Sequence, residues 1–124
     1  MLSSVLIIED DPDIRLLAKL SLQQAGHDVF EAETGEEGLD ALDSRVPDVI
    51  LLDIRLPGVD GWKVLESVRR SPELRAVTVI MMSAHSSGHT VEIAKARGAD
   101  GYIVKPFRQD ELLQTIGPSE TPGK

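Results

Sequence analysis

The chain contains no cysteine, and this absence excludes both disulfide bonds and thiolate metal sites. Its N-terminus has no basic segment, and the first apolar run, at residues 5–8, ends at three acidic residues, so we expect no signal peptide. No apolar run in the sequence approaches the length of a membrane-spanning helix. Together these absences predict a soluble, cytoplasmic protein.

Positive charge is scarce relative to negative charge. Thirteen Lys and Arg residues stand against 21 Asp and Glu residues, which gives a formal net charge of −8 at pH 7. An acidic surface repels phosphate backbones, so we predict no direct binding to nucleic acid. What the chain does contain is ordinary for one globular domain: 124 residues, of which 41% are hydrophobic and 27% charged.

Short apolar runs alternate with segments of helical periodicity along the chain. We predict strands at 5–8, 29–32, 49–52, 77–82 and 102–104, and helices at 13–25, from 34 to just before 47, and at 61–70, 90–97 and 109–116. Continuous apolar strands are typical of parallel sheets that are buried on both faces, so the pattern indicates an α/β domain. This domain would occupy residues 1–117, and residues 118–124 would form a polar tail or the start of a linker.

Polar side chains stand where the predicted strands end. Glu9 and Asp10 follow the first strand, and Asp53 ends the third. Ser83 and Lys105 follow the fourth and fifth strands. The carboxyl ends of parallel strands meet at one edge of the sheet, which is where open α/β sheets bind their ligands. The sequence therefore predicts a functional site at this edge.

Each of these residues also has a structural interpretation. Asp11 precedes Pro12 and is typical of a helix N-cap, and the two acids before it could simply be exposed. Ser83 could be a loop hydroxyl and Lys105 a solvated side chain. Asp53 is harder to explain in this way, because we expect it to cap nothing nearby. Their joint placement at one edge favours function over coincidence.

Carboxylates crowded into one crevice repel one another. Two unit charges about 4 Å apart interact by roughly 4 kcal/mol at an intermediate dielectric constant. Either one carboxyl group stays protonated or a cation lies among them. Oxygen ligands without His or Cys favour a hard ion, and room for waters and phosphate favours Mg²⁺ over Ca²⁺. A metal beside an ionised Asp53 suggests phosphoryl transfer to that carboxylate, with the Ser83 hydroxyl and the Lys105 ammonium contacting the phosphoryl oxygens.

Four segments, taken in their order and spacing, resemble the receiver domain of two-component response regulators: Glu9-Asp10, Asp53 followed by RLPGVDG, MMSAH, and GADGYIVKPF. The similarity covers residues 4–116. It implies a flavodoxin-like, doubly wound α/β fold with five parallel strands in the order 2-1-3-4-5 and helices on both faces. It also implies a signalling switch rather than an enzyme acting on another substrate. Asp53 would accept a phosphoryl group from a sensor histidine kinase or phosphotransfer protein, and the altered domain would act on a downstream protein or effector domain.

The resemblance also implies a role for each residue of the acidic edge. Asp10 and Asp53 would ligate Mg²⁺ directly, Glu9 would act through a water molecule, and the backbone carbonyl of Arg55 would complete the protein ligands. By the same resemblance, the peptide bond that follows Lys105 would be cis.

A conformational switch is implied as well. Ser83 would move toward the phosphoryl group and Tyr102 would turn into the vacated space, which would alter the face formed by the fourth helix, fifth strand and fifth helix. An amphipathic strand residue with a solvated hydroxyl is an equally open interpretation of Tyr102. The chain also departs from the family: Ser83 stands where threonine is commoner, and the last predicted helix is short. In this family, positions such as those of Arg55 and His85 tune hydrolysis of the acyl phosphate.

Two other functions compete with this interpretation. A haloacid-dehalogenase-type phosphatase also uses an Asp nucleophile at a strand end, but it needs a second Asp two residues later, where this chain has Arg55. A flavodoxin-type flavin carrier would have a loop rich in Ser, Thr and Gly after the first strand, where this chain has acids.

Overall fold

The structure is a computed structural model that describes residues 3–84 and 87–117, and the predicted tail at 118–124 lies outside these residues. Strands and helices alternate along the chain: β1 (Ser4–Ile8), α1 (Pro12–Gln24), β2 (Asp28–Ala32), α2 (Gly35–Ser44), β3 (Val49–Asp53), α3 (Gly61–Arg70), β4 (Thr78–Ser83), α4 (Gly88–Ala96), β5 (Gly101–Val104) and α5 (Gln109–Ile116). Within the described residues, no helix is long and apolar enough to cross a membrane.

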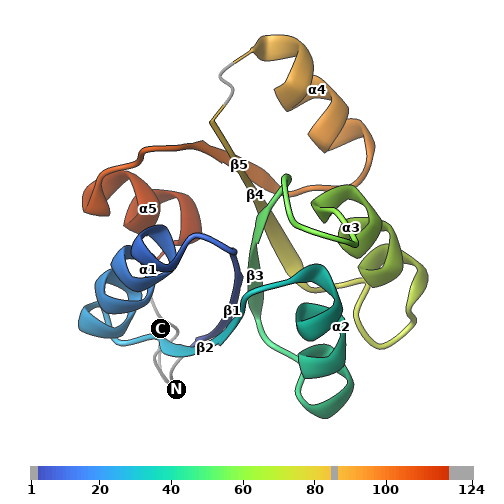
Figure 1. Ribbon diagram of the computed structural model, residues 1–124, viewed down its shortest axis with the longest axis horizontal. Coiled ribbons are helices and arrows are strands. Elements are labelled where there is room, and N and C mark those ends of the chain that lie inside the picture. The colour runs from blue at the N-terminus through green and yellow to red at the C-terminus, as the bar shows by residue number, and fades with distance from the viewer. Residues whose placement is uncertain (1–2, 85–86, 118–124) are drawn as a thin grey trace.

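The five strands form one sheet in the order β2-β1-β3-β4-β5, and every neighbouring pair is parallel. Helices α1 and α5 cover one face of the sheet, and α2, α3 and α4 cover the other (Figure 1). The predicted doubly wound fold and its strand order are therefore confirmed. The order reverses between β1 and β3, since the chain goes outward from β1 to β2 and then returns to β3.

The central strands β1 and β3 carry continuous apolar runs, at residues 5–8 and 49–52, whose side chains are buried on both faces of the sheet. Side chains alternate between two core clusters, as the period of a strand requires. In β1, Leu6 and Ile8 pack on the side of α2, α3 and α4, whereas Val5 and Ile7 pack on the side of α1 and α5. This two-sided burial explains why the sequence shows continuous apolar runs there instead of alternation.

Polar N-caps fix where the helices begin. As predicted, Asp11 caps α1, and its Oδ1 accepts from the backbone N–H of Asp13 at 2.9 Å. Pro12 is the first residue of the helix, one residue earlier than expected, because its fixed φ suits that position. Thr34 caps α2 through its hydroxyl, which accepts from the N–H of Glu37. The Glu37 carboxylate accepts from the N–H of Glu33 and not from that of Thr34, so a capping box is only half formed.

Two glycines shape the loop between β3 and α3. Gly58 has a φ of 73°, in the left-handed region that strains other residues. Gly61 begins α3, and a Cβ atom there would lie 2.2 Å from the backbone oxygen of Asp53. Its N–H donates to the carbonyl of Ile54 at 2.9 Å. The start of α3 therefore packs directly against the end of β3, which is where Asp53 is held.

Candidate functional site: an acidic pocket at the carboxyl edge of the sheet

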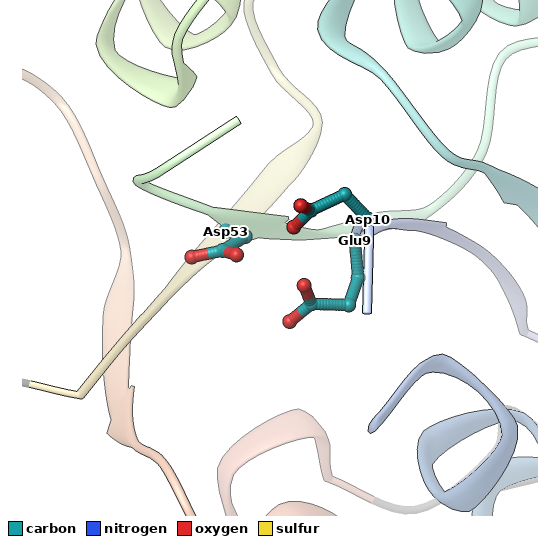
Figure 2. A group of neighbouring side chains, drawn as sticks. All are labelled: Glu9, Asp10 and Asp53. Atoms are coloured by element: carbon teal, nitrogen blue, oxygen red, sulfur yellow. The ribbon is translucent and has the colours of Figure 1, made fainter. Parts of the chain in front are cut away.

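The predicted site residues do meet at the carboxyl edge of the sheet. Glu9 and Asp10 follow β1, and Asp53 is the last residue of β3. One carboxylate oxygen from each of the three lies within 4.8 Å of the others, and Figure 2 shows the three side chains turned toward a common space. Among the described residues, this is the one group of three or more His, Asp and Glu side chains that could hold a metal ion.

Lys105 enters this pocket from the loop after β5. Its ammonium lies 2.9 Å from Glu9 Oε1 and 3.0 Å from Asp53 Oδ2. The Lys105 side chain is only 15% exposed, so the structural interpretation of a solvated lysine is wrong. The peptide bond between Lys105 and Pro106 is cis, as the resemblance implies. One cation thus bridges two of the three carboxylates.

Burial differs sharply among the acids. Glu9 is fully buried and Asp53 is 2% exposed, whereas Asp10 is exposed at the rim. Solvent therefore reaches the pocket on the side of Asp10, while the other two carboxylates lie in the protein interior. The possibility that Glu9 is simply an exposed acid is excluded by this burial.

Electrostatics follow from this crowding. Burial raises the pKa of Glu9, and the neighbouring Asp53 carboxylate adds to the increase, although the hydrogen bond from Lys105 opposes it. Desolvation and then the charge of Glu9 raise the pKa of Asp10. Burial alone would lower the pKa of Lys105, but its bonds to Glu9 and Asp53 outweigh burial and raise it, so the ammonium stays charged at neutral pH.

Asp53 is held on both carboxylate oxygens. Oδ1 accepts from the backbone N–H of Arg55 at 3.2 Å, and Oδ2 accepts from Lys105 at 3.0 Å. The expectation that Asp53 caps nothing nearby was wrong, because the chain turns after β3 and brings the Arg55 amide back to the carboxylate. The side chain of Arg55 is exposed, and its backbone N–H is the group that donates to this carboxylate in the bond described.

Ser83 lies within β4 and is 3% exposed, so it is a buried strand residue instead of a loop hydroxyl. Its carbonyl accepts from the backbone N–H of Lys105 at 2.8 Å, which ties the end of β4 to the loop after β5. Tyr102 is partly buried on β5 and packs against the core cluster on the side of α2, α3 and α4. His85 lies outside the described residues.

The chemistry of the donors fits a hard cation. Three carboxylates supply oxygen ligands, and no His or Cys belongs to the group. The Lys105 ammonium balances one of these three carboxylate charges, and the excess of carboxylates favours a divalent cation such as Mg²⁺ that binds oxygen and retains waters. Glu9, Asp10 and Asp53 are therefore the residues of this structure that could hold a metal.

Sequence reasoning missed one residue beside the pocket. Arg15 of α1 donates from Nη1 to the carbonyl of Glu9 at 2.8 Å and pairs with Glu31 and Glu33 at the end of β2. The signal was present: Arg15 lies four residues after the N-cap Asp11, and helical side chains lean toward the N-terminus, so Arg15 can reach back to the preceding loop.

Comparisons with known proteins identify the family and agree with the fold. The family model of the response regulator receiver domain matches residues 5–117. The chain is 42% identical over 105 residues to the transcriptional regulatory protein AfsQ1 of Streptomyces coelicolor, and 40% identical over 111 residues to the DNA-binding transcriptional regulator NtrC of Klebsiella pneumoniae. These matches cover 85% and 89% of this chain but only 45% and 23% of the two relatives, so the chain spans less than half of their length.

A solved structure extends the likeness to nearly the whole chain. The chemotaxis response regulator CheY4 of Vibrio cholerae matches with a TM-score of 0.89 and 31% sequence identity, and the match covers 94% of this chain and 97% of that one. The phosphatase and flavin-carrier alternatives receive no support from these matches. The family model, the relatives and the fold lead to one conclusion: the chain belongs to the receiver domain family of two-component response regulators.

Proposed function

We propose that the domain is a phosphoacceptor switch in which Asp53 takes a phosphoryl group from a phosphohistidine of a sensor kinase or phosphotransfer protein. The observation that carries this proposal is the position of the Asp53 carboxylate, which is buried at the end of β3 and held by the Arg55 amide and the Lys105 ammonium. A buried carboxylate fixed on both oxygens is oriented for attack instead of being free to rotate.

In the proposed reaction, an Asp53 carboxylate oxygen attacks the phosphorus of the donor. An oxygen–phosphorus bond forms, the phosphorus–nitrogen bond of the phosphohistidine breaks, and the leaving imidazole takes the bonding electrons and a proton. The product is an acyl phosphate on Asp53. Lys105 would shift from its carboxylate partners to a phosphoryl oxygen, and the Ser83 hydroxyl would donate to another. This chain therefore contributes the nucleophile and two donors.

Magnesium fits the same pocket. Asp10 and Asp53 would hold Mg²⁺ directly, Glu9 would act through water, and the Arg55 carbonyl would be a further ligand. When bound, the ion supplies positive charge that stabilises the phosphoryl oxygens during transfer. The raised pKa values of Glu9 and Asp10 support this assignment, because they result from desolvation and then from a neighbouring carboxyl group, and a cation would stabilise the charged forms of both.

The output of the switch would be a change in protein contacts. Ser83 lies at the end of β4, and Tyr102 lies on the neighbouring strand β5, where it pairs with Met81, two residues before Ser83. We infer that movement of Ser83 toward the phosphoryl group lets Tyr102 turn inward and changes the face of α4, β5 and α5. The target would be a separate protein or an attached effector domain. The two relatives named as transcriptional regulators are more than twice as long as the matched segment.

Intact-mass spectrometry tests the phosphoacceptor. With Mg²⁺ and acetyl phosphate, the wild-type chain is expected to gain one phosphoryl group, and Asp53→Asn is expected to gain none because its amide is not a nucleophile. Asp40→Asn is the matched control, since it removes an exposed carboxylate on α2 and should be phosphorylated like the wild type. Equal labelling of Asp53→Asn and the wild type would contradict the assignment.

A further inference from the structure

Arg15 connects the acidic pocket to the neighbouring strand. Its guanidinium donates to the Glu9 carbonyl at 2.8 Å, and the same group pairs with Glu31 at 3.3 Å and Glu33 at 3.1 Å. The Arg15 side chain is 14% exposed, and its bond to the Glu9 carbonyl is partly buried, whereas Glu31 and Glu33 are 31% and 63% exposed. A planar guanidinium can satisfy three acceptors on different sides at once, whereas a lysine ammonium is a point charge on a flexible stem.

With Arg15 in place, every polar group of Glu9 has a partner. Its N–H donates to the carbonyl of Ala32 at 3.1 Å, and its carbonyl accepts from Arg15. Its carboxylate accepts from Lys105 on Oε1 and from the N–H of Asp11 at 3.1 Å on Oε2. Arg15 supplies the carbonyl contact, which fixes the peptide unit between Glu9 and Asp10. The orientation of this peptide unit sets where Asp10 projects.

We propose that Arg15 is a positioning residue for the acidic pocket: by holding the Glu9 carbonyl against the end of β2, it fixes the loop that presents Glu9 and Asp10 to the cation. The inference rests on the proposed magnesium-dependent function but concerns a residue that does not itself ligate the ion. Groups that orient metal ligands typically change metal affinity by about 10- to 100-fold when they are removed.

Charge and position make opposite predictions for this residue. If Arg15 acted only through its charge, removing that charge would leave Glu31 and Glu33 less neutralised and would tighten Mg²⁺ binding. If Arg15 positions the loop, losing its planar fork weakens Mg²⁺ binding whether or not the charge is kept. Comparing Arg15→Lys with Arg15→Gln therefore separates the two roles.

The experiment measures Mg²⁺ affinity by isothermal titration calorimetry for the wild type, Arg15→Lys and Arg15→Gln, after urea denaturation has established that each is folded. Both variants are expected to bind Mg²⁺ about tenfold more weakly than the wild type. In the metal-free protein, NMR hydrogen exchange of the Asp11 amide, which donates to Glu9, should be faster in both variants.

Arg45→Lys is the matched control. Arg45 also bonds to β2 through Asp28 and reaches Ser4 at 3.0 Å, but it lies at the amino edge of the sheet, away from the pocket. Its Mg²⁺ affinity and its Asp11 exchange should equal those of the wild type. A pure stability effect of Arg15 would lower the unfolding free energy and leave the Mg²⁺ affinity of the folded protein unchanged, which would overturn the inference.

The remaining outcomes are also decisive. Tighter Mg²⁺ binding by Arg15→Gln, or wild-type affinity in Arg15→Lys, would overturn the positioning role while leaving Mg²⁺ binding and Asp53 phosphorylation of the wild type intact. A wild-type chain that binds no Mg²⁺ and accepts no phosphoryl group would overturn the proposed function and this inference with it. The wild-type measurements alone therefore distinguish a failure of the Arg15 positioning role from a failure of the proposed function.

Discussion

The two edges of the sheet use the same kinds of charged residues in different surroundings. At the amino edge, Arg45 pairs with Asp28, and the two side chains are 43% and 51% exposed. At the carboxyl edge, Lys105 pairs with Glu9, and the exposed fractions are 15% and 0%. Water screens the first pair and is largely absent around the second. An ion pair at the amino edge is therefore nearly neutral for stability, whereas one at the carboxyl edge cannot be broken without leaving a buried charge.

The two edges also differ in how far their carboxylates depend on added positive charge. The Asp28 carboxylate of the amino edge is exposed to solvent and paired with Arg45. The buried carboxylates of the carboxyl edge, Glu9 and Asp53, repel one another and share the Lys105 ammonium. The carboxyl edge is thus held in a state that added positive charge stabilises, which is the physical basis for the proposed response to Mg²⁺ and phosphoryl groups.

The largest expected effect comes from removing the pocket cation. Lys105→Met leaves Glu9 and Asp53 buried without their partner, and we expect it to lower the unfolding free energy in the absence of metal by about 2 kcal/mol. This value lies below that of a fully buried pair because Lys105 retains some solvent contact. Urea denaturation at pH 7 provides the measurement, and millimolar Mg²⁺ should restore part of the loss.

Arg45→Met is the counterpart at the amino edge and should cost less than about 1 kcal/mol, as exposed ion pairs do. If Arg45→Met and Lys105→Met lowered the unfolding free energy by similar amounts, the proposed difference between the two edges would be wrong.

Metal binding gives the next effect in size. Mg²⁺ at ten times its dissociation constant should stabilise the wild-type fold by about 1.4 kcal/mol, and Asp10→Asn should abolish most of this gain because a carboxylate ligand is lost. Thermal unfolding with and without Mg²⁺ measures the difference. Asp11→Asn, one residue away, keeps a good N-cap for α1 and should respond to Mg²⁺ like the wild type. An equal loss of response in both variants would show that general negative charge, and not the Asp10 ligand, attracts the ion.

Much of the fold, and the position of the site at the carboxyl edge of the sheet, could be predicted from local sequence patterns. Continuous apolar runs such as 5–8 and 49–52 identify strands that are buried on both faces of the sheet. The end of each run then places the residue that follows it at the edge of the sheet. Alternating strands and helices then bring Glu9, Asp53 and Ser83 to one edge without any knowledge of their contacts. These inferences succeed because they depend on backbone periodicity and on topology, which a sequence records directly.

Side-chain pairing across the fold could not be predicted in the same way. Lys105 lies 96 residues from Glu9 and 52 from Asp53, and only the folded sheet decides that one ammonium touches both. The Arg15 contact with the Glu9 carbonyl depends on how closely α1 packs beside β2. Near α2, the Glu37 carboxylate accepts from the Glu33 amide and not from the Thr34 amide. Choices among nearby acceptors rest on small energy differences that residue types alone do not fix.

The smallest expected effect is the pH dependence of stability that Glu9 contributes at the carboxyl edge. Because the pKa of Glu9 is raised above its ordinary value of 4.5, the folded state binds this proton more tightly than the unfolded state. The resulting stability is fully present below pH 4.5 and is lost as the pH rises through the folded pKa.

Glu9→Gln stays neutral, so without metal it should gain stability relative to the wild type between pH 4.5 and 7, as measured by urea denaturation at several pH values. A pH-independent difference between Glu9→Gln and the wild type would contradict the proposed desolvation of Glu9, and added Mg²⁺ should reverse the order of stability by favouring the charged carboxylate.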